Sequence, residues 1–138
     1  MGQKEKHLEF IQGVINRMAG NSFLLKGWSV TLVAALFALS AKESYLGFVY
    51  LAYFPAIAFW ILDGYFLRQE KLFRELYNCV RVKKEEEIDF SMDTESFKKK
   101  VVSWFCVMFS TTLRIFHGVV IVSIIIVMLI MLLTKKGV

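Results

Sequence analysis

Hydrophobic and polar residues alternate along this chain in blocks that predict helices. Between residues 3 and 20, apolar side chains recur every three or four positions, which is typical of an amphipathic helix. Its apolar stripe consists of Leu8, Ile11, Ile15 and Met18. We expect this helix to lie on a membrane surface or to pack against the protein's own cytoplasmic part, because both arrangements cover the same face. Gly20 and Asn21 then predict a break in the helix, with Asn21 or Ser22 as the cap of the next helix.

Two long apolar blocks follow and predict a transmembrane hairpin. Residues 22–41 form a run of about 20 residues, the length that a helix needs to cross about 30 Å of hydrocarbon. After a short loop at 42–46, residues 47–67 form a second such run, which must return antiparallel beside the first. Pro55 lies in the middle of this second span, where it frees a backbone carbonyl and kinks the helix.

The rest of the chain predicts a cytoplasmic segment and a third span. Apolar residues continue at helical spacing after Leu67, so the second helix is expected to extend into water within a charged segment at 68–100. Ser91 and Asp93 offer N-caps for a helix that starts near Thr94. Residues 101–134 then predict one long helix of roughly 51 Å, which contains the third span.

Composition agrees with an all-α integral membrane protein that forms a single membrane domain over residues 1–138. Of the 138 residues 57% are hydrophobic, well above the roughly 45–50% of ordinary soluble domains. The net charge of +5 comes from Lys and Arg residues that flank the apolar blocks, so lipid explains it better than nucleic acid does. We therefore expect the lipid bilayer as a partner and no nucleic-acid binding.

The distribution of positive charge predicts the orientation. Lys and Arg gather in the N-terminal segment and between the second and third spans, whereas the loop between the first two spans holds only Lys42. The N-terminus and the 68–100 segment are therefore expected to be cytoplasmic. The C-terminus, with Lys135 and Lys136, then lies outside, against the usual charge bias.

Four ionisable residues within or beside the spans are candidate functional residues. Lys26 lies about one turn inside the first span and Asp63 about one turn before the end of the second, so the hairpin places them at similar depth. They are expected either to pair or to extend separately to the headgroups. Arg114 needs lipid phosphate, an acid such as Asp63, or a place in a charged ring of an oligomer. His117, one turn later, is either structural or a proton sensor.

Basic residues after the second span are candidates for contact with a cytoplasmic partner or with lipid. They are Arg68, Lys71, Arg74, Arg81, Lys83 and Lys84. Four acidic residues follow and match no calcium loop, so they are expected to be a solvated charge run; they are Glu85, Glu86, Glu87 and Asp89.

Signatures of enzymes and cofactors do not occur. The sequence holds no HExxH, no paired CxxC, no glycine-rich phosphate loop and no GxSxG, so neither catalysis, a metal nor another cofactor is expected. Cys79 and Cys106 lie in different surroundings and predict no disulfide. The start, MGQKEKHLEF, lacks a secretory signal, so the N-terminus is expected to be retained.

Two stretches carry a resemblance. RMAGNSFLLKGW before the first span and LDGYFLRQEKLFRELY at the end of the second resemble small, mostly uncharacterised multi-pass proteins of bacterial membranes. Over residues 1–82 the architecture also resembles the SLATT-type two-helix effectors that are proposed to perforate membranes in antiphage systems. The additional C-terminal helix departs from that pattern.

These observations favour an oligomeric protein of the bacterial inner (plasma) membrane that forms or gates a pore or perturbs the membrane. The resemblance implies a role in antiphage defence. The alternative is a membrane anchor or partner subunit that recruits a cytoplasmic protein through residues 68–100.

Overall fold

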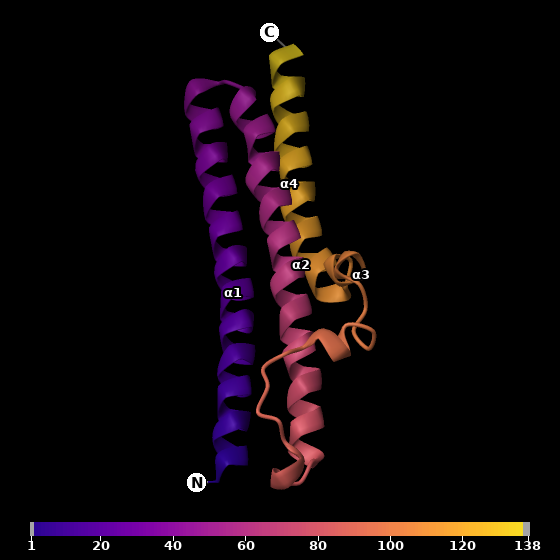
Figure 1. Ribbon diagram of the computed structural model, residues 1–138. Helices are drawn as coiled ribbons and strands as arrows, with labels where there is room; N and C mark the ends of the chain where they lie inside the picture. The colour runs from indigo at the N-terminus through magenta and orange to yellow at the C-terminus, as the bar shows by residue number, and fades with distance from the viewer. Residues whose placement is uncertain (1, 137–138) are drawn as a thin grey trace.

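The computed structural model describes residues 2–136, and three long helices dominate it (Figure 1). Their bounds are Gln3–Glu43 for α1, Gly47–Val82 for α2 and Thr111–Lys136 for α4. A short helix, α3, covers Trp104–Met108, and 3₁₀ turns cover Glu85–Glu87 (η1) and Glu95–Phe97 (η2). No strand occurs in this part of the chain, which confirms the all-helical fold class.

The central helix of the arrangement is α2 (Figure 1). Helices α1 and α2 run antiparallel along their full lengths, and α4 packs beside the N-terminal half of α2. Ser44 takes a left-handed conformation with φ of 50° at the end of α1, and the chain turns there into α2. Helices α1 and α4 make few contacts with each other, so α2 holds the assembly together.

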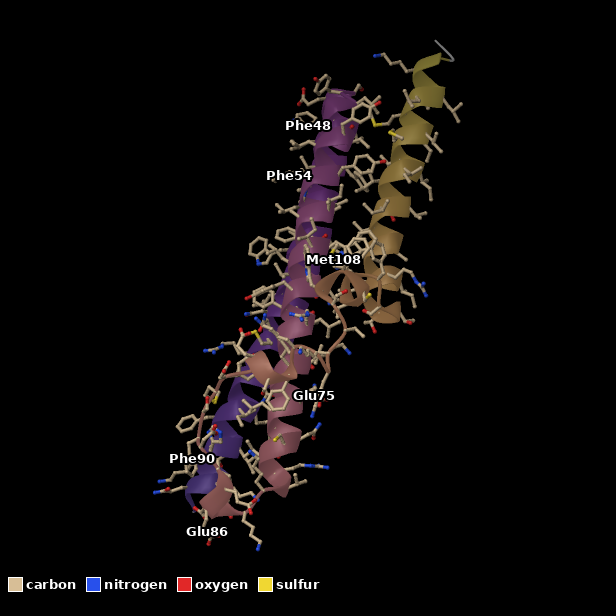
Figure 2. The ribbon with its side chains drawn as sticks, turned by 45° about the vertical axis from the view of Figure 1, so that its right-hand side comes forward. Phe48, Phe54, Glu75, Glu86, Phe90 and Met108 are labelled. Carbon is tan, nitrogen blue, oxygen red and sulfur yellow. The ribbon has the colours of Figure 1, made fainter. Side chains whose placement is uncertain are left out.

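The molecule divides lengthwise into an apolar half and a charged stalk. The apolar half consists of residues 22–43, 47–67 and 111–135, and the stalk consists of residues 3–20 with 68–103. Figure 2 shows nitrogen and oxygen tips concentrated in the stalk, whereas the half that contains Phe48 and Phe54 carries mostly carbon. Helices α1, α2 and Thr111–Lys135 of α4 are each long and apolar enough to cross a membrane. Three candidate spans were expected, and three are present.

The apolar half exposes many large hydrophobic side chains, as a membrane protein does to lipid. Its own core is small and lies along α2, where Val49, Ala52 and Ala56 meet Val33 of α1 and Ile124 of α4. Large side chains on the other faces are exposed; examples are Phe54, Ile57, Val119, Val122, Ile126, Ile130 and Leu133. A continuous apolar surface of this kind is unfavourable in water and stable in hydrocarbon.

The stalk has a separate core, which includes the amphipathic face of residues 3–20. Ile11 and Ile15 of α1 are buried against Leu72 and Leu76 of α2, with Ile88 and Phe97 covering one side. The amphipathic face therefore packs on the protein's own second helix, which is one of the two arrangements expected for it. The prediction that α2 continues past Leu67 as a helix is confirmed.

The break expected at Gly20 and Asn21 is wrong, because α1 is one helix from Gln3 to Glu43. Gly and Asn are weak helix formers, but their cost of roughly 0.5–1 kcal/mol each is small beside tertiary packing. Contacts to α2 on both sides of this point, at Ile15 and at Ser22, hold the helix in register.

The single long helix expected at 101–134 is wrong as well, since α3 ends at Met108 and α4 begins at Thr111. The indole Nε1 of Trp60 donates to the carbonyl of Met108 at 2.9 Å. In a continuous helix that carbonyl would accept the N–H of residue 112. Upstream, the helix expected near Thr94 is reduced to η2, with the Asp93 carboxylate accepting the N–H of Glu95 at 2.9 Å.

Candidate functional site

Asp63 of α2 is the centre of the candidate site. Its side chain is fully buried, and it lies where α2 faces both α1 and α4. The neighbouring Gly64 makes room for α3, because a Cβ there would stand 3.3 Å from the Cα of Met108. An ionised carboxylate at such a position needs several donors to offset the loss of water.

Helix α1 supplies two of those donors. Lys26 Nζ lies 2.6 Å from Asp63 Oδ2, and the Ser22 hydroxyl donates to Asp63 Oδ1. Ser22 and Lys26 are four residues apart, so they share one helical face, and Lys26 Nζ also donates to Ser22 Oγ at 2.7 Å. The predicted pairing of Lys26 with Asp63 is confirmed. The Lys26 side chain keeps 20% of its surface exposed, while that of Asp63 keeps none.

Helix α4 supplies the third donor, His117. Its Nε2 lies 2.8 Å from Asp63 Oδ2, and its ring stacks on Trp60 at a centroid distance of 5.7 Å and an interplanar angle of 7°. With a carboxylate as partner, Nε2 carries the proton. His117 Nδ1 is buried without a hydrogen-bond partner among residues 2–136.

The three contacts link the carboxylate of α2 to donors from both of the other long helices, two from α1 and one from α4. We call Ser22, Lys26, Asp63 and His117 the junction. It holds a cation beside an anion in the apolar half, so the charges cancel where hydrocarbon would penalise either of them alone. The junction can therefore hold the three helices together, and separating them would expose charge.

The junction has no further ligands for a metal. Within the described residues, no three His, Cys, Asp or Glu side chains gather closely enough to hold one. Asp63 and His117 are the only members with metal-binding side chains, and Lys26 occupies the adjoining space.

Arg114 was expected to seek an acid such as Asp63, and the structure contradicts that pairing. Arg114 is exposed and forms no ion pair within residues 2–136, whereas His117, three positions later, reaches the carboxylate. Three residues turn a helix by about 300°, which leaves Arg114 exposed while His117 is buried. The lipid-phosphate and oligomer interpretations of Arg114 remain predictions.

The basic residues after the second span do not form one cluster. Arg74 pairs with Glu70 at 2.7 Å, and Arg68 Nε donates to the carbonyl of Val102 at 3.2 Å. The carbonyls of Arg81 and Lys83 accept from Lys4 Nζ, which joins the start of α1 to the end of α2. Lys71, Arg74, Arg81 and Lys84 are exposed, the first three on the face of α2 opposite its buried Leu72 and Leu76.

Sequence reasoning missed Ser22 and Trp60 as parts of the site. Ser22 was interpreted as a helix cap, although its spacing of four from Lys26 placed both on one face. Trp60 lies three residues before Asp63, so helical spacing places these two side chains on one face as well. Neither signal shows by itself which side chain of the third helix completes the group.

The fold and the junction together define the class of this protein. It is a small α-helical protein with three candidate membrane spans. No known family model, curated protein or solved structure matches the chain.

Proposed function

We propose that this chain is an oligomeric protein of a bacterial inner membrane that gates a path across the bilayer, with the junction as its closing latch. The observation that carries the proposal is that one buried carboxylate of α2, Asp63, binds side chains from both of the other long helices, α1 and α4. Ionisable groups inside a membrane are costly and are usually retained for function.

Oligomerisation is part of the proposal because three helices cannot enclose a water-filled path. On the side where α1 and α4 barely touch, a groove of about 530 Å³ opens between Val30 of α1 and Ile115 and Val119 of α4. A helix of a neighbouring copy fills this groove in the proposed assembly. A purely monomeric chain in mild detergent, measured by light scattering, would rule this mechanism out.

Gating in this proposal consists of breaking the junction. While Lys26 and His117 contact Asp63, the charges face the interior of one protomer and no polar path exists. Moving α1 or α4 away from α2 exposes Lys26 and Asp63, which then line the path between protomers. No catalytic step is assigned.

The orientation proposed places the stalk in the cytoplasm, because the Lys and Arg residues gather there. The architectural resemblance to SLATT-type effectors supports a use of this gate in antiphage defence. Loss of protection against phage on deleting the gene, restored by the unmodified chain and by an Asp89→Asn control, would test that role.

Ion flux from liposomes tests the gate itself. We expect low flux for the unmodified chain and at least roughly tenfold higher flux for Asp63→Asn, because about 1.4 kcal/mol of lost closing free energy shifts a two-state equilibrium by that factor. The exposed Asp89→Asn is the matched control and should leave flux unchanged.

A double variant separates gating from damage to the bilayer by misfolded protein. Lys26→Asp combined with Asp63→Lys restores opposite charges at the same two positions, and flux should return toward that of the unmodified chain. Equal flux from Asp63→Asn and the unmodified chain would refute the latch.

The second candidate, a membrane anchor for a cytoplasmic protein, is favoured by the exposed basic face of the stalk. Lys71, Arg74 and Arg81 lie on the outer side of α2, away from its contact with α1. No flux in liposomes, together with a soluble protein that copurifies with the chain but not with a Lys71→Glu/Arg81→Glu variant, would support the anchor over the gate.

A further inference from the structure

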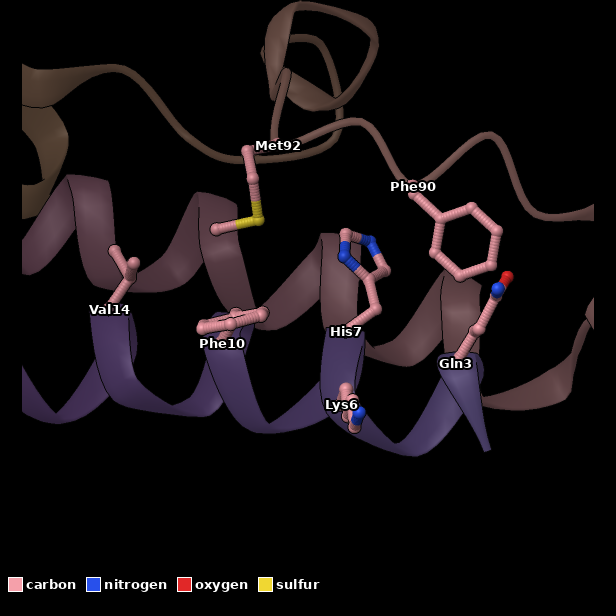
Figure 3. A pocket seen from close by; sticks show the side chains of 7 residues that line it. All are labelled: Gln3, Lys6, His7, Phe10, Val14, Phe90 and Met92. Atoms are coloured by element: carbon pink, nitrogen blue, oxygen red, sulfur yellow. The ribbon is translucent and has the colours of Figure 1, made fainter. Parts of the chain in front are cut away.

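A pocket on the stalk, far from the junction, contains one of the four buried side-chain polar atoms that have no hydrogen-bond partner among residues 2–136. It lies between α1 and the chain segment 88–94, and its volume is about 550 Å³ (Figure 3). Small-molecule sites commonly have about 300–1,000 Å³. His7 precedes Ser22 by roughly 22 Å along α1, so the pocket is separate from the apolar half.

His7 forms the polar floor of the pocket. Only 5% of its surface is exposed, and its Nε2 has no hydrogen-bond partner among the described residues. Figure 3 shows its imidazole directed away from α1, toward the segment that carries Phe90 and Met92. An unpaired buried polar atom is unfavourable, so a ligand that forms a hydrogen bond with it gains affinity.

Aromatic and thioether side chains form the walls. Phe90 meets the His7 ring edge to face with a centroid distance of 5.5 Å, and Phe10 and Met92 line the opposite side. Phe10 keeps 70% of its surface exposed although it lies in the stalk, where water surrounds it in the proposed orientation. Aromatic rings and methionine favour a planar aromatic ligand.

The rim supplies charge and a further polar group. Lys6 is the one charged residue among those that line the pocket, and Gln3 adds an amide. The nearby carboxylates of Asp89 and Asp93 each accept a backbone N–H of their own segment, at 3.1 and 2.9 Å. The N–H of Gln3 in the first turn of α1 does not bind the ligand's anion, because it already donates to the Glu85 carboxylate at 3.0 Å.

We propose that this pocket binds a small planar aromatic molecule that carries an anionic group. The ring lies against Phe10 and Phe90, an oxygen attached to the ring pairs with His7 Nε2, and the anion meets Lys6 at the rim. The site does not depend on the proposed gate, because binding is measured without any flux.

Calorimetric titration of the full chain in phosphatidylcholine nanodiscs tests the site, with empty nanodiscs as the blank. The probe is 1-naphthyl phosphate, and 1-naphthol and inorganic phosphate are its two halves. We expect saturable binding of one probe per chain, at least roughly tenfold tighter than either half, because ring and anion contribute together. Absence of saturable binding, or equal affinity for 1-naphthol, would overturn the proposal.

Variants at exposed positions localise the binding without disturbing the fold. Lys6→Gln should weaken 1-naphthyl phosphate roughly three- to tenfold and leave 1-naphthol unchanged, whereas Lys42→Gln on the same helix should change neither. Phe10→Ala should weaken both aromatic probes, and the equally exposed Phe23→Ala should not. Binding that ignores both Lys6→Gln and Phe10→Ala would exclude this pocket.

His7→Leu tests the buried group. It keeps a side chain of similar volume but removes the nitrogen, so affinity should fall for both aromatic probes. A thermal melt shows whether this variant folds, and the exposed variants decide the question if it does not.

Discussion

Exchanging the charges of Lys26 and Asp63 gives the most direct measure of the junction. Asp63 is fully buried and its Oδ2 lies 2.6 Å from Lys26 Nζ and 2.8 Å from His117 Nε2. In Asp63→Asn the new amide offers one acceptor oxygen to three donors, and its NH₂ group adds donors of its own. Lys26 then loses its counter-charge while four-fifths of its side chain remains covered.

The expected cost follows from that geometry. Removing one partner of a buried pair destabilises a protein by about 3–5 kcal/mol, and we expect the lower end because Lys26 reaches the surface. About 3 kcal/mol corresponds to a fall in melting temperature of roughly 10 °C for a chain of this size. Asp89→Asn, an exposed change of the same chemistry, should shift melting by less than about 2 °C.

The double variant Lys26→Asp/Asp63→Lys decides whether the loss belongs to the pair. A true pair should recover at least part of the stability lost in either single variant, as a double-mutant cycle measures it. Recovery stays incomplete because His117 and Ser22 remain oriented as donors toward position 63. The assay is thermal melting in detergent. Equal melting temperatures for the swapped and single variants, or for Asp63→Asn and the unmodified chain, would refute the reasoning.

Three further predictions concern the stalk, the end of α3 and the orientation. Ile11→Ala empties a fully buried position and should cost about 2–5 kcal/mol in stalk stability, visible as faster hydrogen exchange in residues 3–20 with little change in the apolar half. Trp60→Phe removes the indole donor to the last carbonyl of α3 but keeps a ring over the histidine, so it should cost roughly 1 kcal/mol and expose α3 to exchange; unaltered exchange there would contradict the capping role. In a chain without its native cysteines, a cysteine at Glu86 should react with an impermeant maleimide only after permeabilisation and one at Ser44 in intact cells, and the opposite pattern would reverse the proposed orientation.

The sequence alone determined the helical blocks and part of the junction. Runs of about 20 apolar residues have no stable alternative to helices in a membrane, because every backbone polar group must be satisfied within the segment. The short loop forced residues 47–67 to return beside residues 22–41, and matched depth then brought Lys26 to Asp63. Helical spacing after Leu67 likewise indicated that α2 continues into the stalk.

Tertiary contacts decided what local signals could not. Gly20 and Asn21 look like a helix end in isolation, but packing along α2 outweighs their propensity and keeps α1 continuous. The chain between Met108 and Thr111 looks helical, but the Trp60 indole takes the carbonyl that continuation needs.

Tertiary structure also decided which of Arg114 and His117 contacts Asp63. Both lie near the start of α4, and only the rotation of that helix against α2 shows which one faces Asp63. The stalk pocket depends on the same kind of information, since the segment that carries Phe90 has no periodicity that places it over His7. Sequence sets where helices form, whereas their rotation and the path of the connecting chain follow from side chains that are far apart in sequence.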